Sequence, residues 1–137
     1  MNTPPIPAPL RQTLQQQPDL AFAVLVGSRA TGMQRPDSDW DIALQWAPTV
    51  DAYSALGATE TLRRQLAHAL QQPETAIDLI DLRHANLAMR ASAAEEGQPL
   101  HVANDLVWAR FLERTWRELE QFEWEQRHHR PAQPHRS

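Results

Sequence analysis

The sequence predicts an α+β fold in which a small β-sheet is flanked by helices and a long helix forms the C-terminal part of the domain. Residues 20–26 form an apolar run that is too short to span a membrane and is typical of a strand buried on both faces. Residues 40–46 alternate between two kinds of side chain, as a strand with two different faces does. Residues 105–127 carry apolar side chains at helical spacing, which indicates the long helix.

Prolines, glycines and capping residues divide the rest of the chain into shorter elements. In chain order they are a helix at 10–17, a helix from the N-cap Asp51 to about residue 72, a third strand at 76–82, a helix at 84–96 and an edge strand at 98–103. Asn104 or Asp105 is expected to cap the last helix.

A chain of 137 residues with a pI near 5.8 suits one domain with a single core. We expect one domain over residues 1–137, made of a flexible arm at 1–9, a catalytic core at 10–103, the C-terminal helix at 104–128 and a disordered tail at 129–137.

The composition excludes several classes of protein. The chain has no cysteine, which excludes disulfides, thiol catalysis and a thiolate zinc site. All 13 basic residues are arginines, so no lysine is present to act in a P-loop or as a nucleophile. A net charge of −4 without a basic stripe argues against binding of duplex nucleic acid. No long apolar run or secretory signal is present, so we expect a cytoplasmic protein that does not bind membranes.

Two carboxylates share one face of the second strand. Period-two alternation places Asp39 and Asp41 on one face, and Trp40, Ile42 and Leu44 on the other. Adjacent carboxylates repel each other unless a cation lies between them. Magnesium is the natural occupant, since it prefers a few carboxylates together with substrate phosphates.

The first strand ends in a turn that suits an anion. Gly27 permits a tight turn and a close approach, and Ser28 offers a hydroxyl and a backbone N–H. Arg29 and Arg35 could pair with phosphate or could be solvated loop residues. Residues 35–38 are expected to form a turn that returns the second strand beside the first, which brings Ser28 to the same end of the sheet as the carboxylates.

The third strand contains a carboxylate that needs a partner. Asp78 interrupts an apolar run, and a buried carboxylate is costly unless it is paired or binds a metal. Asp81 lies on the opposite face and closer to the strand end, where capping or solvation is easier. Asp78 is therefore preferred over Asp81 as the carboxylate that needs a partner, and Asp81 is the alternative.

The string GSRATGMQRPDSDWDIAL resembles a known signature. Gly27-Ser28, ten intervening residues and then Asp39-Trp40-Asp41 are similar to the GS(x10)DxD motif of the polymerase-β-like nucleotidyltransferases. The string is most similar to minimal nucleotidyltransferases (MNT), the antitoxins of HEPN–MNT toxin–antitoxin pairs. The resemblance implies a small mixed β-sheet flanked by helices, and it covers residues 20–103 better than the last helix. Thr31 departs from the commonest family string, in which arginine is frequent at this position.

The resemblance also implies an activity: transfer of AMP from ATP to a tyrosine hydroxyl of a HEPN ribonuclease toxin, which silences the toxin. Asp39, Asp41 and Asp78 would hold two Mg²⁺ ions, and Asp78 would also orient or deprotonate the acceptor hydroxyl. Gly27, Ser28, Arg29 and Arg35 would contact the triphosphate. Two alternatives are an antibiotic nucleotidyltransferase and a non-catalytic antitoxin that acts by steric binding.

The apolar stripe of the last helix has two interpretations. Its members, from Trp108 to Phe122, could pack on the sheet, as most amphipathic helices do. Alternatively, the outer half, together with the off-stripe Trp124, could bind a partner protein.

Overall fold

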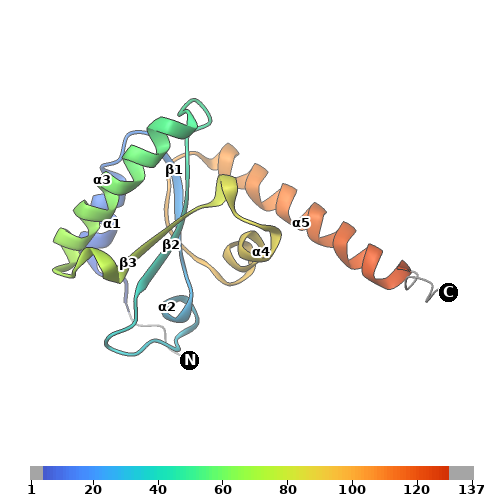
Figure 1. Ribbon diagram of the computed structural model, residues 1–137, viewed down its shortest axis with the longest axis horizontal. Coiled ribbons are helices and arrows are strands. Elements are labelled where there is room, and N and C mark those ends of the chain that lie inside the picture. The colour runs from blue at the N-terminus through green and yellow to red at the C-terminus, as the bar shows by residue number, and fades with distance from the viewer. Residues whose placement is uncertain (1–4, 130–137) are drawn as a thin grey trace, which may run out of the picture.

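The computed structural model describes residues 5–129 and confirms the predicted α+β fold (Figure 1). Within these residues, a four-stranded mixed sheet has the order β3-β2-β1-β4. The strand β1 is antiparallel to both β2 and β4, whereas β2 is parallel to β3. The strands are β1 (Leu20–Val26), β2 (Trp40–Trp46), β3 (Ile77–Asp81) and β4 (Gln98–Val102).

Helices cover both faces of this sheet (Figure 1). They are α1 (Ala8–Gln15), α2 (Ser28–Thr31), α3 (Ala52–Leu70), α4 (Leu87–Glu96) and α5 (Asp105–His128), with short 3₁₀ turns at Glu74–Ala76 and Leu82–His84. The predicted N-cap Asp51 accepts a hydrogen bond from Ser54 N at 2.7 Å. Of the two proposed caps for α5, Asn104 is the one observed, and it accepts from Val107 N.

Two helix starts differ from the sequence-based expectation. The first helix begins at Ala8 rather than at residue 10, because proline suits the first turn of a helix, where its missing N–H costs nothing. Residues 8 and 9 therefore belong to α1 and not to an arm, while residues 1–4 and most of the expected tail lie outside the described residues. The helix α4 begins at Leu87 rather than at 84, because residues 82–84 form a 3₁₀ turn.

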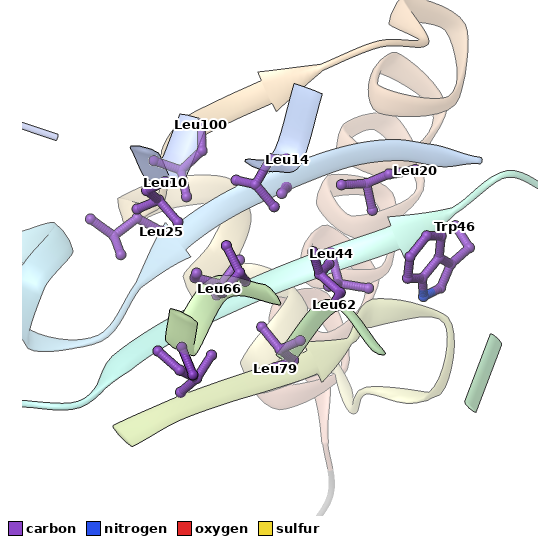
Figure 2. Close-up of a cluster of buried hydrophobic side chains, with 14 of the residues drawn as sticks. Leu10, Leu14, Leu20, Leu25, Leu44, Trp46, Leu62, Leu66, Leu79 and Leu100 are labelled. Carbon is purple, nitrogen blue, oxygen red and sulfur yellow. The ribbon is translucent and has the colours of Figure 1, made fainter. Parts of the chain in front are cut away.

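The first core lies between the sheet and the helices α1 and α3 (Figure 2). Leu10 and Leu14 lie one turn apart on α1, as Leu62 and Leu66 do on α3, so each pair points to the same side of its helix. Facing residues from β1, β2 and β3 complete the cluster, among them Leu25, Leu44, Trp46 and Leu79. All seven residues of β1 are buried, which confirms that this strand is covered on both faces.

The second core lies between the other face of the sheet and the helices α4 and α5. Phe22 from β1 contacts two aromatic rings of α5, with centroid distances of 4.8 Å to Trp108 and 5.3 Å to Phe111. The buried Arg90 of α4 donates to Glu118 of α5 at 2.8 Å. The helix α5 is therefore fixed against the sheet by its first two turns and against α4 as far as Glu118.

The outer half of α5 is different, because it projects beyond the body of the domain (Figure 1). Trp116, Phe122 and Trp124 are 47%, 49% and 54% exposed. The packing interpretation thus holds for the inner half of the helix and not for the outer half. None of the helices within residues 5–129 is long and apolar enough to cross a membrane.

Candidate functional site

Strand register brings the predicted site residues to one end of the sheet. Asp41 of β2 lies directly opposite Asp78 in the parallel strand β3. On its other side, Asp41 lies opposite Val26, the last residue of β1. Gly27 and Ser28 follow Val26 immediately, so the serine turn and the two carboxylates meet at this end. Asp39 lies two residues before Asp41, at the end of the loop that leads into β2.

Asp41 and Asp78 point to the same face of the sheet. Their strand neighbours Ile42 and Leu79 lie in the first core, under α1 and α3. Ala43 and Ile80, which share the alternation of the two carboxylates, lie against the second core. The carboxylates are therefore on the side that α4 and α5 cover, at the end of the strands where β1 gives way to α2.

The electrostatics of the site are those of a carboxylate cluster. Burial raises the pKa of the Asp41 carboxyl above its ordinary value, and the charges of Asp78 and Asp39 raise it further. The nearby guanidinium of Arg29 lowers the same pKa and offsets part of this effect. The negative charges of the cluster are thus only partly neutralised by the one arginine beside it, which favours binding of a further cation.

Gly27 is required for two separate reasons. Its φ of 74° lies in the left-handed region, where only glycine is free of strain. In addition, a Cβ atom at this position would collide with Oδ2 of Asp41, whose Cγ would lie 3.2 Å away. The close approach that glycine allows is therefore that of the Asp41 carboxylate to the turn that carries Ser28.

Asp78 and Asp81 have different environments. The expectation that Asp78 is buried is wrong, because β3 is an edge strand and this side chain is exposed at its open end, where it belongs to the carboxylate cluster. The Asp81 carboxylate instead accepts a hydrogen bond from Arg83 N at 2.9 Å and caps the turn at residues 82–84. The preference for Asp78 as the third acidic residue agrees with this arrangement, although its role stays a prediction.

The two arginines of the site differ in how they are held. Arg29 donates from Nη2 to Ser38 O at 2.8 Å, and its guanidinium lies over the ring of Trp40. Arg35 is exposed and begins the predicted turn, which Ser38 N closes by donating to Arg35 O at 3.0 Å. The Arg35 side chain is therefore on the outer side of the loop.

Sequence reasoning missed one positioning residue. Arg63 of α3 donates to Ile77 O, the carbonyl that immediately precedes Asp78, and also pairs with Glu60 at 3.2 Å. This contact fixes the start of β3 relative to α3. The only signal in the sequence is the Glu60–Arg63 spacing on one helix face, which is common on solvated helices.

The donor set suits a divalent metal ion, because hard cations such as Mg²⁺ prefer carboxylate oxygens. Within residues 5–129, however, no group of three or more His, Cys, Asp or Glu side chains is arranged to hold a metal ion. Asp39 and Asp78 are exposed and can reach other rotamers at little cost. Binding would therefore require these two side chains to turn toward Asp41.

The comparison with known families identifies the class of protein. The chain belongs to the polymerase beta nucleotidyltransferase family, whose model matches residues 9–105. The match runs from α1 through β4 and ends as α5 begins, so it contains every residue of the predicted site.

Several solved structures that are similar to this chain are toxin–antitoxin complexes, in agreement with the resemblance seen in the sequence. The protein is 27% identical to a chain of a toxin–antitoxin complex with AMP-PNP, with a TM-score of 0.66. The match covers 87% of the present chain and 90% of the chain in that complex. A chain of an MntA–HepT toxin–antitoxin complex gives 26% identity, a TM-score of 0.58 and coverage of 85% and 86%. A third similar chain comes from a tri-AMPylated Shewanella oneidensis HEPN toxin in complex with an MNT antitoxin. It gives 25% identity and a TM-score of 0.56, and the match covers 87% of the present chain and 84% of the chain in that complex. Among curated proteins, no sequence matches this chain.

The two left-handed glycines provide a matched test of the close approach. We expect Gly27→Ala to abolish metal binding, because the new methyl group must displace the Asp41 carboxylate as well as strain the backbone. Gly32→Ala meets the same strain at φ 80° but has no heavy atom within 4 Å of the new Cβ, so it should cost only about 1 kcal/mol. Thermal denaturation and a metal titration of both variants would test this. Equal loss of metal binding in both variants would contradict it.

The raised pKa of Asp41 predicts that this residue destabilises the metal-free fold. A carboxyl with a raised pKa binds its proton more tightly in the folded state, so stability falls as pH rises from about 3.9 through the raised value. Asp41→Asn should therefore have a higher Tm than the wild type at pH 7 with EDTA present. The difference should vanish below about pH 3.9, where Asp41 is neutral.

Circular dichroism melts across this pH range would measure the effect, and added Mg²⁺ provides the control. Magnesium should raise the Tm of the wild type and not that of Asp41→Asn, because only the wild type gains a ligand. A lower Tm for the variant at pH 7 without metal would show that the carboxylate stabilises the fold instead.

Proposed function

We propose that this protein transfers AMP from ATP to a tyrosine hydroxyl of a cognate HEPN toxin and thereby neutralises the toxin. The observation that carries the proposal is the register that sets Asp41 opposite Asp78 and beside the Ser28 turn. The similarity to chains from a complex with AMP-PNP and from a complex with a tri-AMPylated toxin supports both the donor and the acceptor. The cytoplasmic location stays a prediction.

Each residue has a role in this proposal. Ser28 and the neighbouring backbone N–H groups at the start of α2 hold the outer phosphates, since a turn of this kind directs N–H donors toward an anion. The exposed Arg35 side chain can reach the same phosphates from the loop. Asp39, Asp41 and Asp78 would hold two Mg²⁺ ions, which would neutralise charge on the triphosphate and acidify the acceptor hydroxyl.

The transfer step is an in-line displacement at the α-phosphorus of ATP. The acceptor hydroxyl oxygen forms a bond to this phosphorus while the bond to the bridging oxygen breaks, and pyrophosphate leaves. Asp78 accepts the hydroxyl proton, because it is exposed at the open end of the cluster, where an acceptor can approach. The contribution of the protein is positioning and charge neutralisation, as in other phosphoryl-group transfers.

The two rival functions are less well supported. The similar solved structures come from toxin–antitoxin complexes and not from antibiotic-modifying enzymes. A purely steric antitoxin has no use for a partly buried carboxylate beside two like charges, yet the sheet holds Asp41 in such a position.

The toxin is proposed to contact the outer half of α5. Leu119 and Phe122 line an apolar groove with Leu87, Ala88 and Ala91 of α4. The carboxylates point to this same side of the sheet, so a protein docked at the groove approaches the face from which an acceptor must enter. Exposed aromatic side chains are enriched at protein interfaces, and the solved relatives are complexes with a toxin.

The direct test is to incubate the protein with its genetic neighbour, ATP and Mg²⁺ and to weigh both proteins by intact mass spectrometry. The neighbour should gain mass in steps of one AMP. Asp39→Asn and Asp41→Asn should remove transfer and keep the fold, and Asp78→Asn should slow turnover about a hundredfold or more with little change in ATP binding. Asp81→Asn is the matched control, because asparagine still accepts the capping hydrogen bond.

Two outcomes would contradict this assignment. Normal transfer by Asp39→Asn or Asp41→Asn would exclude the metal role. A turnover defect confined to Asp81→Asn would show that the wrong third carboxylate was chosen.

A second test addresses the interface. Trp124→Ala should weaken binding to the toxin at least about tenfold, because interface tryptophans often contribute about 2 kcal/mol. Its Tm should barely change, since Trp124 is 54% exposed and stacks on His128 at 4.3 Å, away from both cores. Phe111→Ala is the contrast, with a loss of about 3–5 kcal/mol of stability from the second core. Titration calorimetry and melting curves would measure both, and a large drop in Tm for Trp124→Ala would place this residue in the fold.

A further inference from the structure

Arg29 connects the two halves of the candidate site. It belongs to α2, next to Ser28, yet its guanidinium reaches across to the loop that precedes β2. Nη2 donates to Ser38 O at 2.8 Å, and Nε lies 3.3 Å from both Ser38 O and Asp39 O. One side chain from the serine turn therefore holds the backbone that carries the first carboxylate of the pair.

The Arg29 guanidinium also packs on an aromatic ring. Its Cζ atom lies 3.9 Å from the ring centroid of Trp40, in a cation–π arrangement. The Trp40 side chain is partly buried against the first core, so the ring is itself held in place. Two carbonyl oxygens and one ring face thus restrain the plane of Arg29, which leaves this side chain little freedom to follow a phosphate group.

We propose that Arg29 is a positioning residue, which sets the distance between the Ser28 turn and the Asp39–Asp41 pair through its hydrogen bonds to Ser38 O and Asp39 O. The inference rests on the proposed function for its catalytic meaning. It differs from the expectation that Arg29 binds phosphate, because Nε and Nη2 are engaged with carbonyl oxygens of the loop and the plane of the guanidinium is held against Trp40.

Arginine is suited to this task where lysine is not. The planar guanidinium presents several donors in fixed directions and stacks on an aromatic face, whereas an ammonium group is a single strongly hydrated point charge. Lysine at position 29 could keep the charge and at most part of the contact with the two carbonyls. Charge and geometry can therefore be separated experimentally at this residue.

The experiment compares Arg29→Lys, Arg29→Gln and the surface control Arg64→Gln, whose arginine is exposed on α3. Transfer kinetics give kcat and the KM for ATP, and calorimetry with Mn²⁺ alone gives metal affinity without any need for activity. Hydrogen exchange at Ser38 N, which closes the turn, reports on the loop itself.

For Arg29→Gln we expect kcat to fall about ten- to a hundredfold with an almost unchanged KM, since small displacements of reacting groups have effects of this size. Mn²⁺ should bind several times more weakly, and Ser38 N should exchange faster. Arg29→Lys should keep the fold and show the same pattern, reduced in size, while Arg64→Gln should match the wild type.

The opposite pattern would overturn the inference. A raised KM for ATP with normal kcat, normal Mn²⁺ affinity and normal exchange would make Arg29 a phosphate ligand. If the wild type transfers no AMP at all, the proposed function fails, but Mn²⁺ affinity and exchange still decide the role of Arg29. Unchanged values for both in Arg29→Lys and Arg29→Gln would then reject it.

Discussion

The pairing of Asp41 with Asp78 across two parallel strands is the constraint on which the rest of the site depends. Parallel strands need a crossover connection, and here α3 provides it between β2 and β3. The crossover brings together carboxylates that are far apart in the chain, and the sheet holds them in register despite their mutual repulsion. Burial of α3 against the first core supplies the favourable free energy that offsets this repulsion.

The site is built from backbone geometry more than from side-chain networks. Gly27 leaves space for the Asp41 carboxylate. Arg29 donates hydrogen bonds to two backbone carbonyl oxygens, and Arg63 donates one to the carbonyl that precedes Asp78. Each of these contacts fixes where a strand or turn begins. The acidic side chains are thereby free to respond to a substrate, while the main chain that carries them stays in place.

Strand alternation was sufficient to predict the faces of β2 and β3, because the period of two is a property of the extended backbone itself. It placed Asp41 and Ile42 on opposite sides, as observed. Local signals also predicted the cap at Asp51 and gave Asn104 as one of two candidate caps for α5. The hydrogen bonds of Arg29 and Arg63 could not be predicted, because both side chains donate to backbone carbonyls. Every residue has such a carbonyl, so the sequence does not indicate which one accepts the bond. The early start of α1 differs from the expectation because the prolines near the N-terminus predict irregular chain, whereas proline is tolerated in the first turn of a helix.

The location of β3 at the edge of the sheet has a consequence for how the protein loses activity. An edge strand has one neighbour, so β3 pairs with β2 alone, while Ile77 and Leu79 attach it to the first core. Loss of this strand would separate Asp78 from Asp41 and would also open the first core. The carboxylate pair and the packing of the sheet are thus expected to be lost together when the protein is heated or denatured.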